Sequence, residues 1–154
     1  MAKRRKNHFT PEARDRRERL IGLNPWGGFN HNNLGCELFQ MGHFAMAASE
    51  FQRAVEINPW KAHFKANLAR ALLALGEIER AQLMARKALE QEPRQPGALF
   101  AHALILENIG ENKKAIAAYR ACIAAGPSIA IQRDIEENLK NLLQRIDKET
   151  GDDV

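Results

Sequence analysis

Apolar and polar positions follow a helical rhythm along most of this chain, and the rhythm repeats every 34 residues. Each repeat contains two stretches of about 12 to 16 residues in which apolar side chains recur at spacings of three and four, so that they share one helix face. A glycine separates the two stretches, and a proline follows the second. The pattern therefore predicts three consecutive pairs of antiparallel helices.

Three residue types share this period, and each recurs in its own phase. The glycine is suited to the left-handed backbone conformation that ends the first helix of a pair. The proline ends the second helix, and a small residue in the middle of that helix lets its partner approach closely. The periodic positions are Gly42, Gly76 and Gly110; Pro25, Pro59, Pro93 and Pro127; and Ala13, Ala47, Ala81 and Ala115.

The segment 28–127 resembles three tetratricopeptide repeats, whose pattern runs from an aromatic residue through Leu-Gly, an aromatic, Ala and an aromatic to Pro. The residues that carry the resemblance are Leu34-Gly35, Ala47, Phe51, Ala54 and Pro59 in the first unit, Leu68-Ala69, Leu72, Ala81, Ala88 and Pro93 in the second, and Ala103, Ala115, Tyr119 and Pro127 in the third. The sequence departs from the pattern where His31, Lys65 and Leu99 occupy the first aromatic position and His102 replaces a leucine. Such departures can weaken packing locally, but they leave the period intact.

The resemblance implies an all-α, right-handed superhelical solenoid of antiparallel helix hairpins. Solenoid ends need a cover for their apolar face, and residues from Ile131 to Ile146 supply an apolar stripe for a capping helix with Ser128 as its N-cap. We expect a disordered basic tail (1–9), a degenerate half-repeat helix and turn (10–27), three repeats (28–61, 62–95 and 96–129), the capping helix (130–148) and a frayed tail (149–154).

In this family the first helix of each hairpin lines a concave surface that receives a peptide or a helix. The resemblance therefore implies a binding groove in which Asn33 and Asn67 bond a peptide backbone, while apolar side chains form pockets. The alternative is that the asparagines are merely solvated and the groove stays empty. The groove candidates are Asn32, Asn33, Cys36, Phe39, Gln40, His63, Asn67, Arg70, Leu73, Phe100, Leu104, Glu107 and Asn108.

One subtype of the family binds the C-terminal carboxylate of chaperones with lysine, asparagine and arginine side chains. At the matching positions this chain has Asn32, Cys36, Asn67, Gly97 and Ala101. Only Asn67 fits, so the sequence argues against a carboxylate clamp of that kind, although Arg70 is available to an acidic ligand.

The positive charge is concentrated at the N-terminus. Residues 1–20 hold eight basic and three acidic side chains, whereas the remaining 134 residues hold 15 basic and 16 acidic ones. The basic arm of Lys3, Arg4, Arg5 and Lys6 suits phosphate contacts, which makes nucleic-acid binding an alternative function. Glu12 and Asp15 offset nearby arginines along the helix, and no RNA-binding signature accompanies the arm.

The remaining features point away from catalysis. The five histidines fall in different phases of the repeat, and no metal-binding spacing or phosphate loop is present. We expect a non-catalytic protein without cofactor or metal. The isolated thiols of Cys36 and Cys122, and the lack of a signal peptide or a membrane span, favour a soluble cytoplasmic protein. Trp26 and Trp60, each after a turn proline, leave a homodimer as a further alternative.

Overall fold

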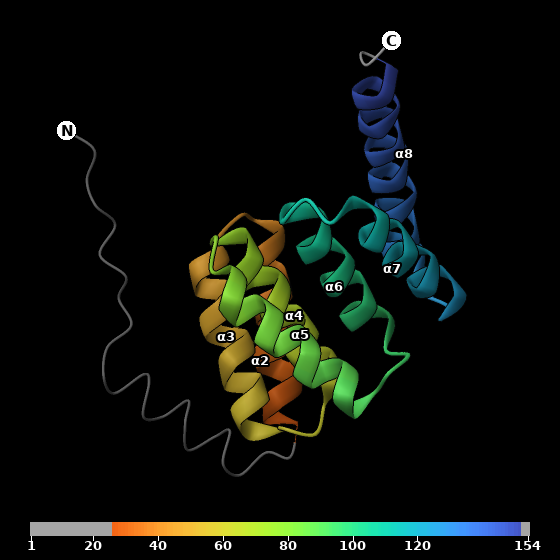
Figure 1. Ribbon diagram of the computed structural model, residues 1–154. Coiled ribbons are helices and arrows are strands. Elements are labelled where there is room, and N and C mark those ends of the chain that lie inside the picture. The colour runs from red at the N-terminus through yellow and green to blue at the C-terminus, as the bar shows by residue number, and fades with distance from the viewer. Residues whose placement is uncertain (1–25, 152–154) are drawn as a thin grey trace, which may run out of the picture.

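The computed structural model describes residues 26–151, and this part of the chain is built of helices without strands (Figure 1). Three hairpins follow one another and a longer helix ends the array, which confirms the predicted all-α solenoid. The predicted basic tail lies outside the described residues, as does nearly all of the half-repeat. The helices are α2 (Gly27–Gln40) with α3 (Phe44–Ile57), α4 (Ala62–Ala74) with α5 (Ile78–Gln91), α6 (Pro96–Asn108) with α7 (Asn112–Ala124), and α8 (Ile129–Gly151).

The periodic glycines make the turns inside the hairpins, as predicted. Gly42, Gly76 and Gly110 have φ angles of 79°, 77° and 82°, in the region where a Cβ atom is unfavourable. In the first turn the N–H of His43 donates to the carbonyl of Leu38 at 2.9 Å, which is the bonding that ends a helix at a left-handed residue. The turns therefore require glycine for its backbone conformation.

Small residues at the helix contacts let the hairpins close. Ala47, Ala81 and Ala115 are fully buried in the middle of α3, α5 and α7. A Cβ atom on Gly35 would lie 2.6 Å from a ring carbon of Phe51, so α2 and α3 approach each other too closely for any larger residue there. The close approach explains why the Leu-Gly pair of the repeat pattern recurs in the first unit.

Two polar residues that replace the expected aromatics are buried and bonded. The ammonium group of Lys65, 8% exposed, donates to the carbonyl of Pro59 and, at 2.6 Å, to the side-chain oxygen of Gln91. His31, 5% exposed, has Nδ1 2.5 Å from a carboxylate oxygen of Glu50, while its Nε2 is buried without a partner. These contacts link neighbouring helices through hydrogen bonds instead of ring packing.

Helix α8 covers the end of the third hairpin. The N–H of Ile131 donates to the hydroxyl of Ser128 at 3.4 Å, which confirms the predicted N-cap. Ile135 and Leu142 are fully buried in a core shared with α6 and α7. The helix continues to Gly151, so the prediction that residues 149–151 belong to a frayed end is wrong. The hydroxyl of Thr150 donates back to the carbonyl of Ile146 at 3.0 Å and extends the last turn.

The far half of α8 projects beyond the hairpins (Figure 1). Although α8 is 23 residues long, neither it nor any other helix within residues 26–151 is apolar enough to cross a membrane.

Candidate functional site

A small pocket opens where the first two hairpins meet. It has a volume of about 100 Å³ and lies between α2, α3 and α4. We call the surface formed by the first helices of the three hairpins (α2, α4 and α6) the groove face. Five of the predicted groove residues line the pocket together with one that was not predicted: Cys36, Phe39, Gln40, Asn67 and Arg70, with Phe51.

Phe51 is the pocket residue that the sequence did not indicate. It comes from the second helix of its hairpin and is 2% exposed, so its place in the repeat pattern assigned it to the core. Its ring passes the position of Gly35, where no side chain stands in the way. The pairing of Gly35 with Phe51 could have indicated this pocket residue from the sequence. Gly35 on α2 has no side chain, so the ring of Phe51 on α3 can reach the groove face.

Asn32 and Asn67 bond to each other across α2 and α4. The Nδ2 atom of Asn67 donates to the Oδ1 atom of Asn32 at 2.8 Å and lies 3.9 Å from the sulfur of Cys36. Asn32, predicted as a groove residue, is 7% exposed. The amide pair joins the two hairpins, whereas Asn33 is exposed.

Arg70 lies between two aromatic rings. Its guanidinium carbon is 5.1 Å from the ring centre of Phe39 on α2 and 5.2 Å from that of Phe100 on α6. Its Nε atom is buried without a hydrogen-bond partner, and no carboxylate of residues 26–151 forms an ion pair with it. Burial lowers the pKa of Arg70, and the more distant charge of Asp134 partly opposes this. The rings of Phe39 and Phe100 thus hold the guanidinium group in place, but no carboxylate of residues 26–151 forms an ion pair with it.

Several predicted groove residues take other places in the fold. Phe100, predicted as a groove residue, is 2% exposed and packs with Tyr119. Leu73 and Leu104 are half-buried against the cores. His63 packs edge-on against Phe64, and burial lowers its pKa. Asn108 is exposed near the end of α6.

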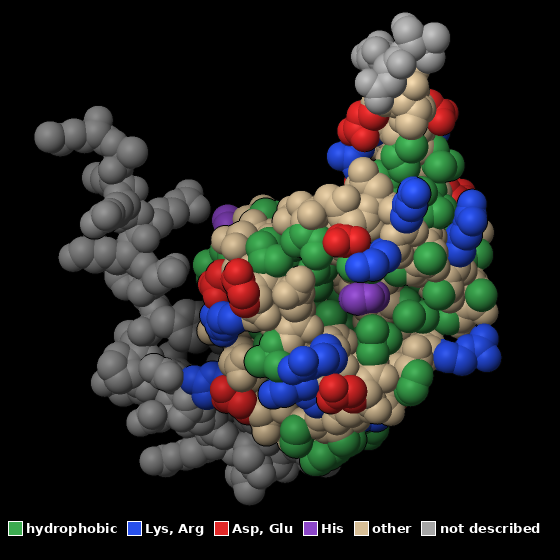
Figure 2. Space-filling model, in the orientation of Figure 1, with side chains coloured by type: hydrophobic (Ala, Val, Ile, Leu, Met, Phe, Trp, Pro, Cys, Tyr) green, Lys and Arg blue, Asp and Glu red, His purple; other side chains and the backbone are tan. Residues whose placement is uncertain are grey.

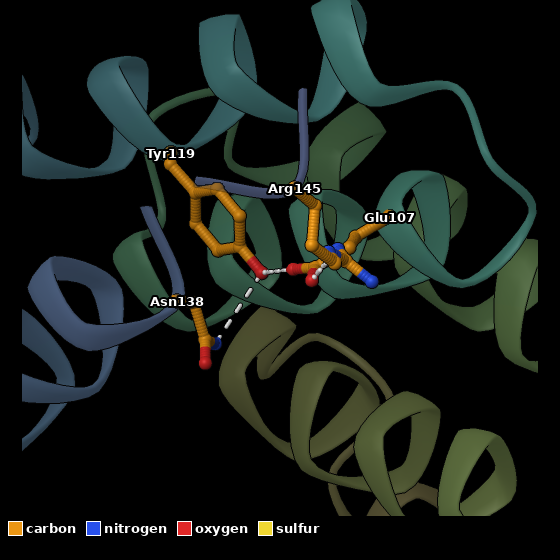
Figure 3. A network of polar contacts seen from close by, with 4 residues as sticks. All are labelled: Glu107, Tyr119, Asn138 and Arg145. Carbon is orange, nitrogen blue, oxygen red and sulfur yellow. Dashed lines mark hydrogen bonds and ion pairs between the residues drawn. The ribbon is translucent and has the colours of Figure 1, made fainter. Parts of the chain in front are cut away.

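Glu107 is engaged by the capping helix (Figure 3). The hydroxyl of Tyr119 donates to one of its carboxylate oxygens at 2.6 Å, and Arg145 of α8 donates to the other at 2.6 Å. Asn138 of α8 donates to the same hydroxyl at 3.3 Å. Burial and then the bond to Glu107 raise the pKa of Tyr119. The fold itself therefore uses the carboxylate of this predicted groove residue.

A larger hollow of about 570 Å³ lies elsewhere, between α5 and α6. His102 lines it, half-buried, and burial lowers the pKa of this histidine. Arg86 and Glu90, which also line the hollow, form an ion pair at 3.7 Å. Acidic, basic and apolar side chains are interspersed over α5 on the face shown in Figure 2. The hollow is larger than the groove pocket, but the groove pocket is lined by Arg70, a partly buried charge that forms no ion pair within residues 26–151.

The thiols differ in their surroundings. Cys36 is half-buried in the pocket, where burial raises its pKa. Cys122 is buried, its thiol donates to the carbonyl of Pro96 at 3.1 Å, and burial raises its pKa to about 11. Within residues 26–151, no three His, Cys, Asp or Glu side chains come together as metal ligands would.

Comparison with known proteins identifies the family to which this architecture belongs. Two family models, each described as a tetratricopeptide repeat, match residues 38–96 and 96–128, which together exceed half of the chain. No curated protein gives a significant match. Similar solved structures include the TPR2B domain of yeast Sti1 in complex with pHsp70 (20% identity, 77% of this chain and 97% of that one, TM-score 0.64) and the Sgt2 TPR domain of Aspergillus fumigatus (23%, 80% and 81%, TM-score 0.65). Another is the first TPR domain of human RPAP3 (14%, 83% and 98%, TM-score 0.68). With its 34-residue period, its hairpins and both family matches, the chain belongs to the tetratricopeptide repeat family.

Proposed function

We propose that this protein is a non-catalytic scaffold that binds a peptide segment or an amphipathic helix of a partner protein on its groove face. The observation that supports this most is the pocket at the first two hairpins, which gathers predicted groove residues from α2 and α4 around the ring of Phe51. Apolar pockets flanked by polar donors are the usual means by which a groove holds a peptide.

The size of the pocket favours a peptide side chain as its occupant. Pockets for small organic ligands have volumes of roughly 300 to 1,000 Å³, whereas this one has about 100 Å³. A single apolar side chain of a partner fits the smaller space, with the rest of the segment lying along α4. Because the pocket is already formed, binding does not require the protein to order itself first.

Structural neighbours support a peptide ligand, but not the same one. The first TPR domain of Spaghetti (RPAP3) is bound to the HSP90 peptide SRMEEVD. At the positions where such domains hold a terminal carboxylate, this chain has a buried Ala101, a glycine at 97 and an Asn67 already bonded to Asn32. We therefore propose a different motif, and we expect SRMEEVD to bind no better than a scrambled peptide of equal charge.

Site-specific photo-crosslinking tests the location of the partner. A photoreactive residue at Gln40, an exposed residue at the pocket rim, is compared with one at Arg120, which is exposed on α7. After pull-down from nuclease-treated extract, we expect a defined partner to crosslink from Gln40 and not from Arg120. Crosslinks from Arg120 alone, or material that disappears with nuclease, would favour the outer surface or the basic arm.

A second candidate is self-association through exposed tryptophans. Trp26 and Trp60 are 64% and 63% exposed, and large exposed aromatic side chains are common at protein interfaces. Sedimentation of the full chain over a range of concentrations tests this. A dimer that Trp60→Ala dissociates supports the candidate, and a monomer at every concentration removes it.

A further inference from the structure

Arg70 is partly buried, and its partners differ from those of Lys65, His31 and Glu107. Lys65 donates to two oxygens, His31 contacts Glu50, and Glu107 accepts from both Tyr119 and Arg145. Arg70 has no such partner within residues 26–151, and its Nε atom is buried and unsatisfied. Burying an N–H donor without an acceptor is unfavourable, so this arrangement gains free energy when an acceptor reaches the guanidinium.

The aromatic contacts position the guanidinium without saturating it. Phe39 and Phe100 reach it from the helices on either side of α4, at 5.1 and 5.2 Å from the ring centres. Ring faces attract the positive charge, but they supply no oxygen acceptor for its N–H donors. A side chain held in this way loses little freedom when a ligand binds. The matching ligand group is a carboxylate, whose two oxygens accept paired N–H bonds from a guanidinium.

We propose that Arg70 recognises the carboxylate of an aspartate or glutamate side chain within the partner's segment, while a neighbouring apolar side chain of that segment enters the pocket over Phe51. This specificity rests on the proposed peptide-binding function of the groove face. It adds the chemistry of the ligand: an internal acidic residue beside an apolar one.

The position of Arg70 favours an internal acidic residue over a chain end. Arg70 belongs to the middle hairpin, with Phe39 from the first hairpin and Phe100 from the third on its two sides. A segment that continues past Arg70 in both directions can contact the hairpins on both sides of α4, whereas a chain that stops there reaches only one of them. Among residues 26–151, the carboxylate whose charge acts on Arg70 is that of Asp134, and the two side chains form no ion pair.

Selection from a library of short random peptides tests the proposal, using the full-length protein as bait. The peptides are displayed in two formats, one fused at both ends and one with a free C-terminus. The baits are the wild type, Arg70→Met, Arg70→Lys and a matched control, Arg120→Gln, which removes an exposed arginine from α7. Circular dichroism and thermal melting of each bait verify that it is folded.

We expect the wild type and Arg120→Gln to enrich peptides fused at both ends that carry Asp or Glu at a fixed offset from an apolar residue. Arg70→Met should still enrich apolar peptides but lose the acidic position. Arg70→Lys should retain only part of the preference, because an ammonium group lacks the planar paired donors. For a synthetic peptide from the wild-type selection, Arg70→Met should weaken binding by about 10- to 100-fold.

The outcomes separate this inference from the proposed function. If the wild type enriches peptides without an acidic position, or if Arg70→Met enriches the same acidic motif, the recognition by Arg70 is wrong while the groove function stands. Enrichment only in the format with a free C-terminus would show a terminal carboxylate and would also overturn the inference. If no bait enriches any peptide, the groove function itself fails and the inference fails with it.

Discussion

Arg70 on α4 and Glu107 on α6 are charged side chains of the same groove face, yet their surroundings are opposite. Glu107 accepts hydrogen bonds from Tyr119 and from Arg145 of the capping helix. Arg70 contacts two rings and has an unsatisfied Nε atom. Both positions were predicted from the repeat register as groove residues, so the register alone does not separate them.

The difference indicates which part of the groove face is available. At the third hairpin, α8 supplies the partners that a ligand would otherwise provide, and the polar groups there stabilise the end of the solenoid. At the first two hairpins, no helix within residues 26–151 supplies a hydrogen-bond acceptor to the Nε atom of Arg70. We infer that stability is concentrated around Tyr119 and that binding is concentrated around Arg70, and substitutions at the two sites should therefore affect different measurements.

The largest effect is expected for Tyr119→Ala. The ring is fully buried among α6, α7 and α8, and truncating a buried aromatic side chain costs about 3 to 5 kcal/mol. Urea denaturation should show this loss in the free energy of unfolding. In the same assay Arg70→Met should leave stability within about 0.5 kcal/mol or raise it, because an unpaired charge is removed. A loss from Arg70→Met as large as that from Tyr119→Ala would contradict the division of roles.

Glu107→Ala should have an intermediate effect. The substitution leaves the buried hydroxyl of Tyr119 and the side chain of Arg145 without their acceptor, at a cost of about 1 to 3 kcal/mol. Amide hydrogen exchange should become faster in α8 and stay unchanged in α2. The double variant with Tyr119→Phe should lose less than the sum of the single losses, and strict additivity would mean that the bond contributes nothing.

Alkaline pH should destabilise the protein through the same network. The pKa of Tyr119 is raised in the folded state, so its contribution is complete below the ordinary value near 10 and decreases as the unfolded phenol ionises above it. The slope approaches about 1.4 kcal/mol per pH unit for one proton. Tyr119 is the single tyrosine of the chain, so the phenolate absorbance reports it directly. Tyr119→Phe should flatten the slope, leaving the contributions of Cys36, whose pKa is also raised, and of Cys122, whose pKa is raised to about 11. An unchanged slope would refute the assignment.

The smallest effect is expected at the groove. Asp134 is exposed, and its charge partly offsets the effect of burial on the pKa of Arg70. Asp134→Asn should strengthen the binding of an acidic peptide by about 1.5- to 5-fold, and less at high salt. Asp147→Asn, an exposed change farther along α8, is the control. Calorimetric titration of each variant with the acidic peptide measures the two affinities. Equal increases in affinity would show that the net charge of the protein, and not the position of Asp134, determines the effect.

The fold was predictable because its determinants are local and periodic. Turn glycines such as Gly42, and buried alanines such as Ala47, recur where each hairpin needs them. The register also predicted Cys36, Phe39 and Arg70 at the groove.

Burial and long-range pairing were not predictable in the same way. The contact that engages Glu107 comes from a residue 38 positions away, and the pattern of α8 does not show which of its polar side chains meets α6. Phe100, predicted as a groove residue, is 2% exposed and contacts the guanidinium of Arg70, and the repeat register alone does not show this burial. Phe51 was assigned to the core, and only the geometry around Gly35 shows that it also reaches the pocket.

The most direct test of the central claim uses Cys36, which lines the pocket, and Cys122, which is buried away from it. The rate at which a thiol reagent modifies each cysteine is measured by mass spectrometry, with and without a saturating peptide from the selection. The account predicts that Cys36 is modified in the free protein and protected by the peptide, while Cys122 stays unmodified in both. If the peptide is fully bound and Cys36 is modified at an unchanged rate, the peptide binds elsewhere and the account of the groove is wrong.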